Sequence, residues 1–185
     1  MILRGMSSWK LIINEGLTTT KRPRGGESHI ADTLYHEARH AEQHFEIARM
    51  LAGRDTTAAP KQIAAEGGIP DWVAAQAKQR AIGAMDPEAA VATAYFEEQH
   101  GSGAAHRKEV MKNVKRWMPV HAKALERREK AWSDPAATDA ERRQADAELQ
   151  KLKEPVTKAY LDYRALLMES DAHAVGEKVG EAYDR

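Results

Sequence analysis

Two histidines and a glutamate stand close together in the segment 36–40, which reads His-Glu-Ala-Arg-His. If this segment is helical, His36 and His40 lie one turn apart on one face, where both imidazoles can bind the same Zn²⁺ ion. Glu37 lies about 100° around the helix from His36, close enough to take a proton from a water on the metal. The segment therefore predicts a zinc site that hydrolyses peptide bonds, with Glu37 as general base.

A pattern this short needs support, because about 0.03 matches are expected by chance in a chain of this composition. A catalytic zinc site needs a third protein ligand, and the chain has no cysteine to supply it. His44 is a poor candidate, since it lies about 12 Å from His36 along a straight helix. The non-functional alternative is a surface helix that carries two unrelated histidines.

The best distant carboxylates are Glu169 and Asp171, which open a segment with helical spacing of apolar residues. This segment could pack against the helix of the motif and direct a carboxylate to the metal. We expect Glu169 to be the third ligand and Asp171 to orient a ligand imidazole, and the two roles could be exchanged. Simple capping of a helix start by acidic residues is the competing interpretation.

Apolar residues recur at spacings of three and four along most of the chain, which predicts a mainly α protein. A short strand is expected at 9–14, where apolar and polar residues alternate. Proline should kink or split the long helix at Pro119 and should end a charged helix before Pro155. With no repeat and no linker, we expect one domain over 1–185. The helices are expected at about 28–53, 70–82, 87–101, 104–132, 138–154 and 169–183.

Charge and hydropathy exclude several classes of protein. Lys plus Arg and Asp plus Glu each number 28, so the formal net charge is zero and no overall field favours nucleic acid or anionic membranes. No apolar run approaches the roughly 20 residues of a membrane span. The first ten residues also lack the apolar region of a secretory signal, so another segment or machine would have to carry the chain out of the cell.

Three separated blocks resemble the zincin metallopeptidase toxin domains at the C-termini of bacterial polymorphic toxins, including Rhs and VgrG type effectors of type VI secretion. The first block, at 33–43, reads Thr-Leu-Tyr-His-Glu-Ala-Arg-His-Ala-Glu-Gln, and the others lie at 101–107 and 163–176. The resemblance implies a gluzincin-like helical domain with zinc as cofactor and Glu169 as third ligand. The chain departs from the family at Leu167, where proline is usual, and at Met168, where an acid is common.

The same resemblance implies an antibacterial effector that is excised from a longer toxin and attacks a protein or peptide substrate. Such an effector is delivered into a target bacterial cell, acts in the periplasm in preference to the cytoplasm, and is neutralised in the producer by a cognate immunity protein. His106 and Tyr163, in the second and third blocks, are candidate donors that would stabilise the oxyanion of the transition state.

Two other classes of function remain open from the sequence. A non-catalytic zinc- or partner-binding helical domain would close the fourth metal position with Asp171, His173 or another chain. A helical interaction domain would bind an acidic macromolecule through the basic residues of 104–132, although a solvated basic face is the simpler interpretation and nucleic acid is not expected as a partner.

Overall fold

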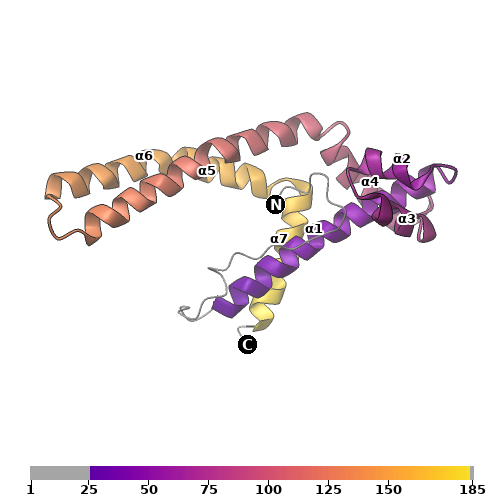
Figure 1. The fold of residues 1–185 in the computed structure, drawn as a ribbon, viewed down its shortest axis with the longest axis horizontal. Coiled ribbons are helices and arrows are strands. Elements are labelled where there is room, and N and C mark those ends of the chain that lie inside the picture. Colours follow the sequence, from indigo (N-terminus) through magenta and orange to yellow (C-terminus); the bar gives the residue numbers. More distant parts are fainter. Residues whose placement is uncertain (1–25, 184–185) are drawn as a thin grey trace. The chain divides into compact units, whose positions relative to one another are not determined.

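The computed structural model describes residues 26–183, which form helices and no strand (Figure 1). The prediction of a mainly α protein is confirmed, whereas the strand expected at 9–14 lies outside the described residues. None of the described helices is both long and apolar enough to cross a membrane. In chain order the helices are α1 (Gly26–Arg54), α2 (Pro60–Gly67), α3 (Asp71–Gln79), α4 (Pro87–Gln99), α5 (Ala104–Ser133), α6 (Asp139–Arg164) and α7 (Leu167–Tyr183).

The contacts divide the described chain into two compact units. The first contains residues 26–104 and 167–183, and therefore holds α1 to α4 together with α7. The second contains residues 105–166, and therefore holds nearly all of α5 and α6. The second unit is thus inserted in sequence between α4 and α7. The expectation of one metallopeptidase domain over 1–185 stays a prediction.

The first unit is built around α1, which packs against α2, α3, α4 and α7. In its C-terminal half, Ile47 and Leu51 are buried one turn apart and contribute to one core cluster with Ile63, Tyr95 and Met168. Burying an aliphatic side chain of this size contributes about 1.5–3 kcal/mol. The apolar half of α1 therefore anchors the helix in the core.

The buried stripe of α1 changes character towards its N-terminus. Moving back from Leu51 and Ile47 at helical spacing, the next buried positions are Gln43 and His36, which are polar. Together with Glu169 of α7, these are the buried polar or charged residues of the described chain. A buried polar group needs a hydrogen-bonding or charged partner, which an apolar core cannot supply. The N-terminal half of α1 therefore depends on polar contacts with other helices.

Helix α7 lies close against α1, and this pair has the most extensive packing among the described elements. The two helices approach closely at Gly176, where an added Cβ would overlap the side chain and the carbonyl of Asp32. The N-terminus of α7 is held by Glu98 of α4, whose carboxylate accepts hydrogen bonds from the backbone N–H groups of Leu167 and Met168. Such a contact satisfies donors that a helix start leaves unpaired.

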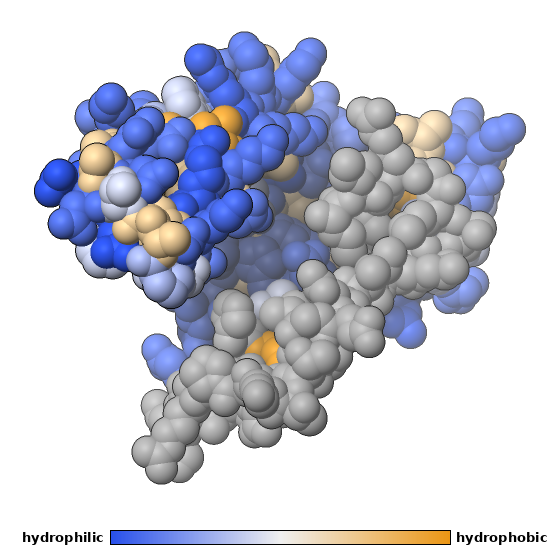
Figure 2. All heavy atoms as spheres, turned by 60° about the vertical axis from the view of Figure 1, so that its left-hand side comes forward, coloured by the Kyte–Doolittle hydropathy of each residue, from blue (hydrophilic) through white to orange (hydrophobic). Residues whose placement is uncertain are grey.

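The second unit is a hairpin of two antiparallel helices, α5 and α6 (Figure 1). Arg127 pairs with Glu148 at 2.6 Å and Arg128 with Asp146 at 2.7 Å across the pair. On the face drawn in Figure 2 the coloured surface is mostly hydrophilic, with apolar side chains in small groups. Buried or partly buried apolar residues recur along both helices, and we call this set the seam. They include Val110, Val114, Trp117, Ala124, Ala131, Ala145, Leu149, Leu152, Val156 and Ala159.

The structure bears on the expectations at the two prolines. Helix α6 continues through Pro155 to Arg164, so the prediction of a helix that ends before Pro155 is wrong. Helix α5 likewise runs through Pro119 without being split in two. An internal proline costs about 3 kcal/mol because it removes one hydrogen bond and crowds the preceding turn. Buried or partly buried apolar residues lie on both sides of each proline, so each helix keeps packing contacts beyond it.

We predict that Gly176→Ala destabilises the first unit, because the new methyl group would overlap Asp32 of α1. The free energy of unfolding should fall by about 1–3 kcal/mol, even though alanine favours a helix more than glycine does. Thermal or denaturant unfolding followed by circular dichroism measures this change. Gly67→Ala is the matched control, since its added methyl would meet a Leu51 methyl at 3.4 Å and should be tolerated. Equal stability of the two variants would contradict close packing at Gly176.

Candidate metal centre

Three side chains from α1 and α7 bring potential metal ligands together. His40 Nε2 lies 3.1 Å from His36 Nε2 and 3.1 Å from Glu169 Oε2, and the third side of this triangle, from His36 Nε2 to Glu169 Oε2, is 3.7 Å. Four ligands at 2.0–2.1 Å around a tetrahedral ion would lie about 3.4 Å apart. The donor atoms therefore fit an ion of that size, and this group could hold a metal ion.

The electrostatics of the two histidines differ. Burial lowers the pKa of His36 below its ordinary value of 6.5, and the neighbouring imidazoles of His40 and His173 lower it further. Burial also disfavours the charged form of His40, but the hydrogen bond and the charge of Glu169 outweigh this effect and raise the pKa of His40. The negative charge of Glu37 partly opposes the lowering of the His36 pKa and adds to the raising of the His40 pKa.

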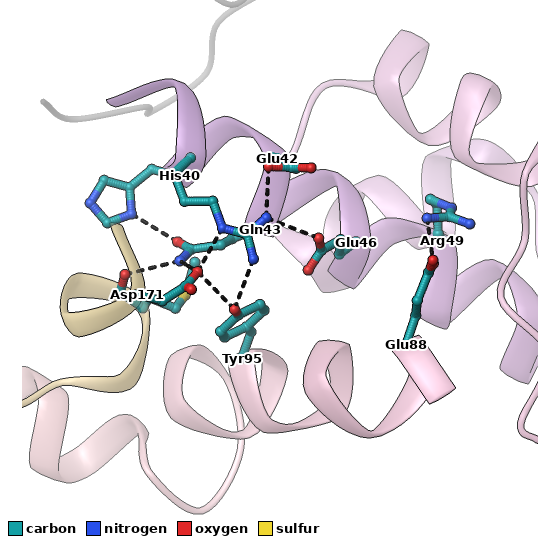
Figure 3. A network of polar contacts seen from close by, with 10 residues as sticks. His40, Glu42, Gln43, Glu46, Arg49, Glu88, Tyr95 and Asp171 are labelled. Atoms are coloured by element: carbon teal, nitrogen blue, oxygen red, sulfur yellow. Dashed lines mark hydrogen bonds and ion pairs between the residues drawn. The ribbon is translucent and has the colours of Figure 1, made fainter. Parts of the chain in front are cut away.

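A hydrogen-bonded residue of α1 connects the ligands to α7 (Figure 3). The side chain of Gln43 is fully buried, and its Oε1 lies 2.9 Å from Nδ1 of His40. Its amide nitrogen donates to the carbonyl of Met168 at 2.9 Å and to Oδ2 of Asp171 at 2.8 Å. Gln43 therefore contacts a ligand imidazole on one side and the start of α7 on the other.

Asp171 is held by donors from two other helices (Figure 3). Besides Gln43, its Oδ2 accepts from Arg39 Nε at 2.6 Å and from the hydroxyl of Tyr95 at 2.9 Å. Burial alone would raise the pKa of Asp171, but these donors lower it, and burial together with Asp171 raises the pKa of Tyr95 to about 12. Arg39 also pairs with Glu46 at 3.2 Å. The ionised carboxylate of Asp171 therefore ties α7 to α1 and α4.

The residues predicted from sequence fall into two sets. His36, His40 and Glu169 form the ligand group within residues 26–183, whereas Asp171 is separated from His40 by Gln43 and does not join that group. His44, one turn further along α1, is also outside the group.

The two candidate oxyanion donors lie elsewhere in the chain. His106 and Tyr163 belong to the second unit, not to the unit that contains the ligand group, and their proposed role stays a prediction.

The sequence reasoning missed four residues of the polar network. Arg39 and Gln43 follow His36 at spacings of three and seven, so helix periodicity alone could have placed them on the same face. Tyr95 and Glu98 come from α4, and no local sequence pattern predicts their contacts with α7.

Comparisons with protein-family models, with curated proteins and with solved structures return no match for this chain.

We predict that Asp171→Asn weakens the packing of α7, because it removes the charge that Arg39 and Gln43 bind. Since the folded-state pKa of Asp171 lies below 3.8, its stabilising contribution is complete above that pH and is lost as the pH falls through the folded pKa. The variant should therefore lose about 1–3 kcal/mol of unfolding free energy near neutral pH. The difference from the parent should shrink below pH 3.8.

Denaturant unfolding measured at several pH values tests this expectation. Asp139→Asn is the control, because the carboxylate of Asp139 is 80% exposed on α6. A stability difference for Asp171→Asn that does not change with pH would contradict a role for its charge.

Proposed function

We propose that this chain is a zinc-dependent metallopeptidase in which His36, His40 and Glu169 bind the metal. The observation that carries the proposal is the ligand triangle, whose sides of 3.1–3.7 Å suit a tetrahedral ion. Two imidazoles and one carboxylate are also a common ligand set of catalytic zinc sites. Burial adds support, since His36 is 9% and Glu169 is 3% exposed. Burying an ionisable side chain costs free energy, and such side chains are concentrated at functional sites.

The number of ligands favours catalysis over a purely structural site. Structural zinc sites are usually closed by four protein ligands, whereas catalytic sites keep one position for water or substrate. Within the described part of the chain, the group contains three residues. Bound zinc would lower the pKa of a water ligand to about 7 and would polarise the carbonyl of a substrate.

Glu37 is the residue to which we assign proton transfer. It follows the ligand His36 directly on α1, is partly exposed, and is not part of the ligand group. A carboxylate beside the metal but not bound to it can accept a proton from the attacking water and donate it to the departing amine. All three residues lie on α1, so the helix fixes the spacing of their backbones.

The alternative is a non-catalytic zinc site, and one contact favours it. The ring of His173 lies one turn beyond Glu169 on α7, with its centroid 4.3 Å from that of His36. A rotation of His173 could bring it to the metal as a fourth ligand and close the site. The catalytic proposal requires that zinc binding does not depend on His173.

The cellular role is inferred from the resemblance of the three sequence blocks to zincin toxin domains. On that basis the chain is the toxic domain of an antibacterial effector, with peptide bonds of the target cell as its substrate and an immunity protein as its partner in the producer.

Zinc binding is tested first. The purified chain should bind one zinc ion, and Glu169→Ala should lower the affinity by more than about 100-fold, beyond the 10–100-fold effect typical of an outer partner. Titration with a competing chelator measures this change, and Glu181→Ala, exposed near the end of α7, is the control. A larger loss in Asp171→Ala than in Glu169→Ala would exchange the two roles. A comparable loss in His173→Phe would support the closed site.

Catalysis is tested with Glu37→Ala. This variant should keep its zinc and its fold, and it should lose peptide hydrolysis by about 10²–10⁴-fold, because the water has no base. Metal content and cleavage of a peptide library measure both properties. The same pair, exported to the periplasm of a bacterial host, should separate a toxic parent from a harmless variant. Full activity of the variant would overturn the mechanism, and a harmless but proteolytic parent would overturn the effector role.

A further inference from the structure

Gln43 is the buried polar residue of the first unit that is not itself a metal ligand. It lies between the ligand His40 and the apolar core that begins with Ile47. A buried amide without partners costs free energy, and here the oxygen and the nitrogen are both paired. Such a side chain can be kept for the direction it imposes on its neighbours.

The orientation of the Gln43 amide follows from its partners. The carbonyl of Met168 can only accept a hydrogen bond, and Oδ2 of Asp171 already accepts from Arg39 and Tyr95. The amide nitrogen must therefore face these two groups, and the oxygen must face Nδ1 of His40 at 2.9 Å. Since an amide oxygen can only accept, Nδ1 of His40 carries the hydrogen.

This hydrogen decides which nitrogen of His40 is available to a metal. A neutral imidazole has one hydrogen, so with Nδ1 protonated the lone pair is on Nε2. Nε2 is the atom that lies 3.1 Å from both His36 Nε2 and Glu169 Oε2. Without Gln43, the acceptor left beside the His40 ring would be the carboxylate of Glu169, which would attract the hydrogen to Nε2.

We propose that Gln43 is a positioning residue that holds His40 in the Nδ1–H tautomer and so presents its Nε2 lone pair to the metal. The same side chain binds the backbone of Met168, next to Glu169, so one residue aligns ligands from two helices. The functional value of this arrangement rests on the zinc site proposed above. The tautomer itself is a property of the metal-free protein.

The experiment compares the parent with Gln43→Met, which has a similar shape but cannot accept from His40 Nδ1. Imidazole ¹⁵N chemical shifts of the metal-free full chain, followed as the pH is raised until the His40 ring is neutral, report the tautomer. The parent should show His40 with hydrogen on Nδ1, and Gln43→Met should shift it towards Nε2. Zinc affinity of the variant should fall by about 10–100-fold.

A further variant separates positioning from general stability. Tyr95→Phe removes one donor from Asp171 without touching the contact between Gln43 and His40, so it should leave zinc affinity within about twofold of the parent.

An unchanged His40 tautomer in Gln43→Met would overturn the proposal, and so would an equal loss of zinc affinity in Tyr95→Phe. If the parent bound no zinc, the proposed function would fail, while the ¹⁵N shifts would still decide the role of Gln43.

Discussion

The packing of α7 against α1 is the interaction on which the candidate site depends. Two ligands come from consecutive turns of α1, so their separation is set by the helix itself. The third, Glu169, has no such constraint and reaches them because α7 lies close enough for Gly176 to meet the backbone of Asp32. Below the ligands, Gln43 and Asp171 fix the register of the two helices through hydrogen bonds. The geometry of the candidate metal site therefore depends on the packing of α7 against α1.

Burying polar side chains in a helical core costs free energy, which other contacts must offset. The two halves of α1 have different roles in this balance. Its C-terminal half is apolar and is anchored in the core by residues such as Leu51, independently of the candidate metal site. Its N-terminal half carries His36 and Gln43, whose burial is favourable only when their partners are in place. The packed C-terminal half of α1 thus holds the polar N-terminal half in position. Metal ligands need such support, because they must stay aligned to within a fraction of an ångström.

Sequence reasoning reached the parts of the site that local rules determine. The spacing of His36, Glu37 and His40 follows from helix geometry, and Glu169 was reachable because a carboxylate opens an apolar helix. The contacts of Tyr95 and Glu98 could not be predicted from the sequence, since they depend on how α4 packs against α7. The error at Pro155 has a different origin, because a local penalty was given more weight than the seam that continues beyond it. Helix α2 was missed because eight residues carry too little periodicity.

The order of the chain gives the ligand group a topological role. His40 and Glu169 are 129 positions apart, and the whole hairpin of α5 and α6 lies in sequence between them. An ion that joined them would close a loop of that length, a step that in an unfolded chain costs on the order of 4–5 kcal/mol of entropy. In effect the metal would act as a reversible cross-link. It would tie the two ends of the first unit together even if the connecting hairpin were cut.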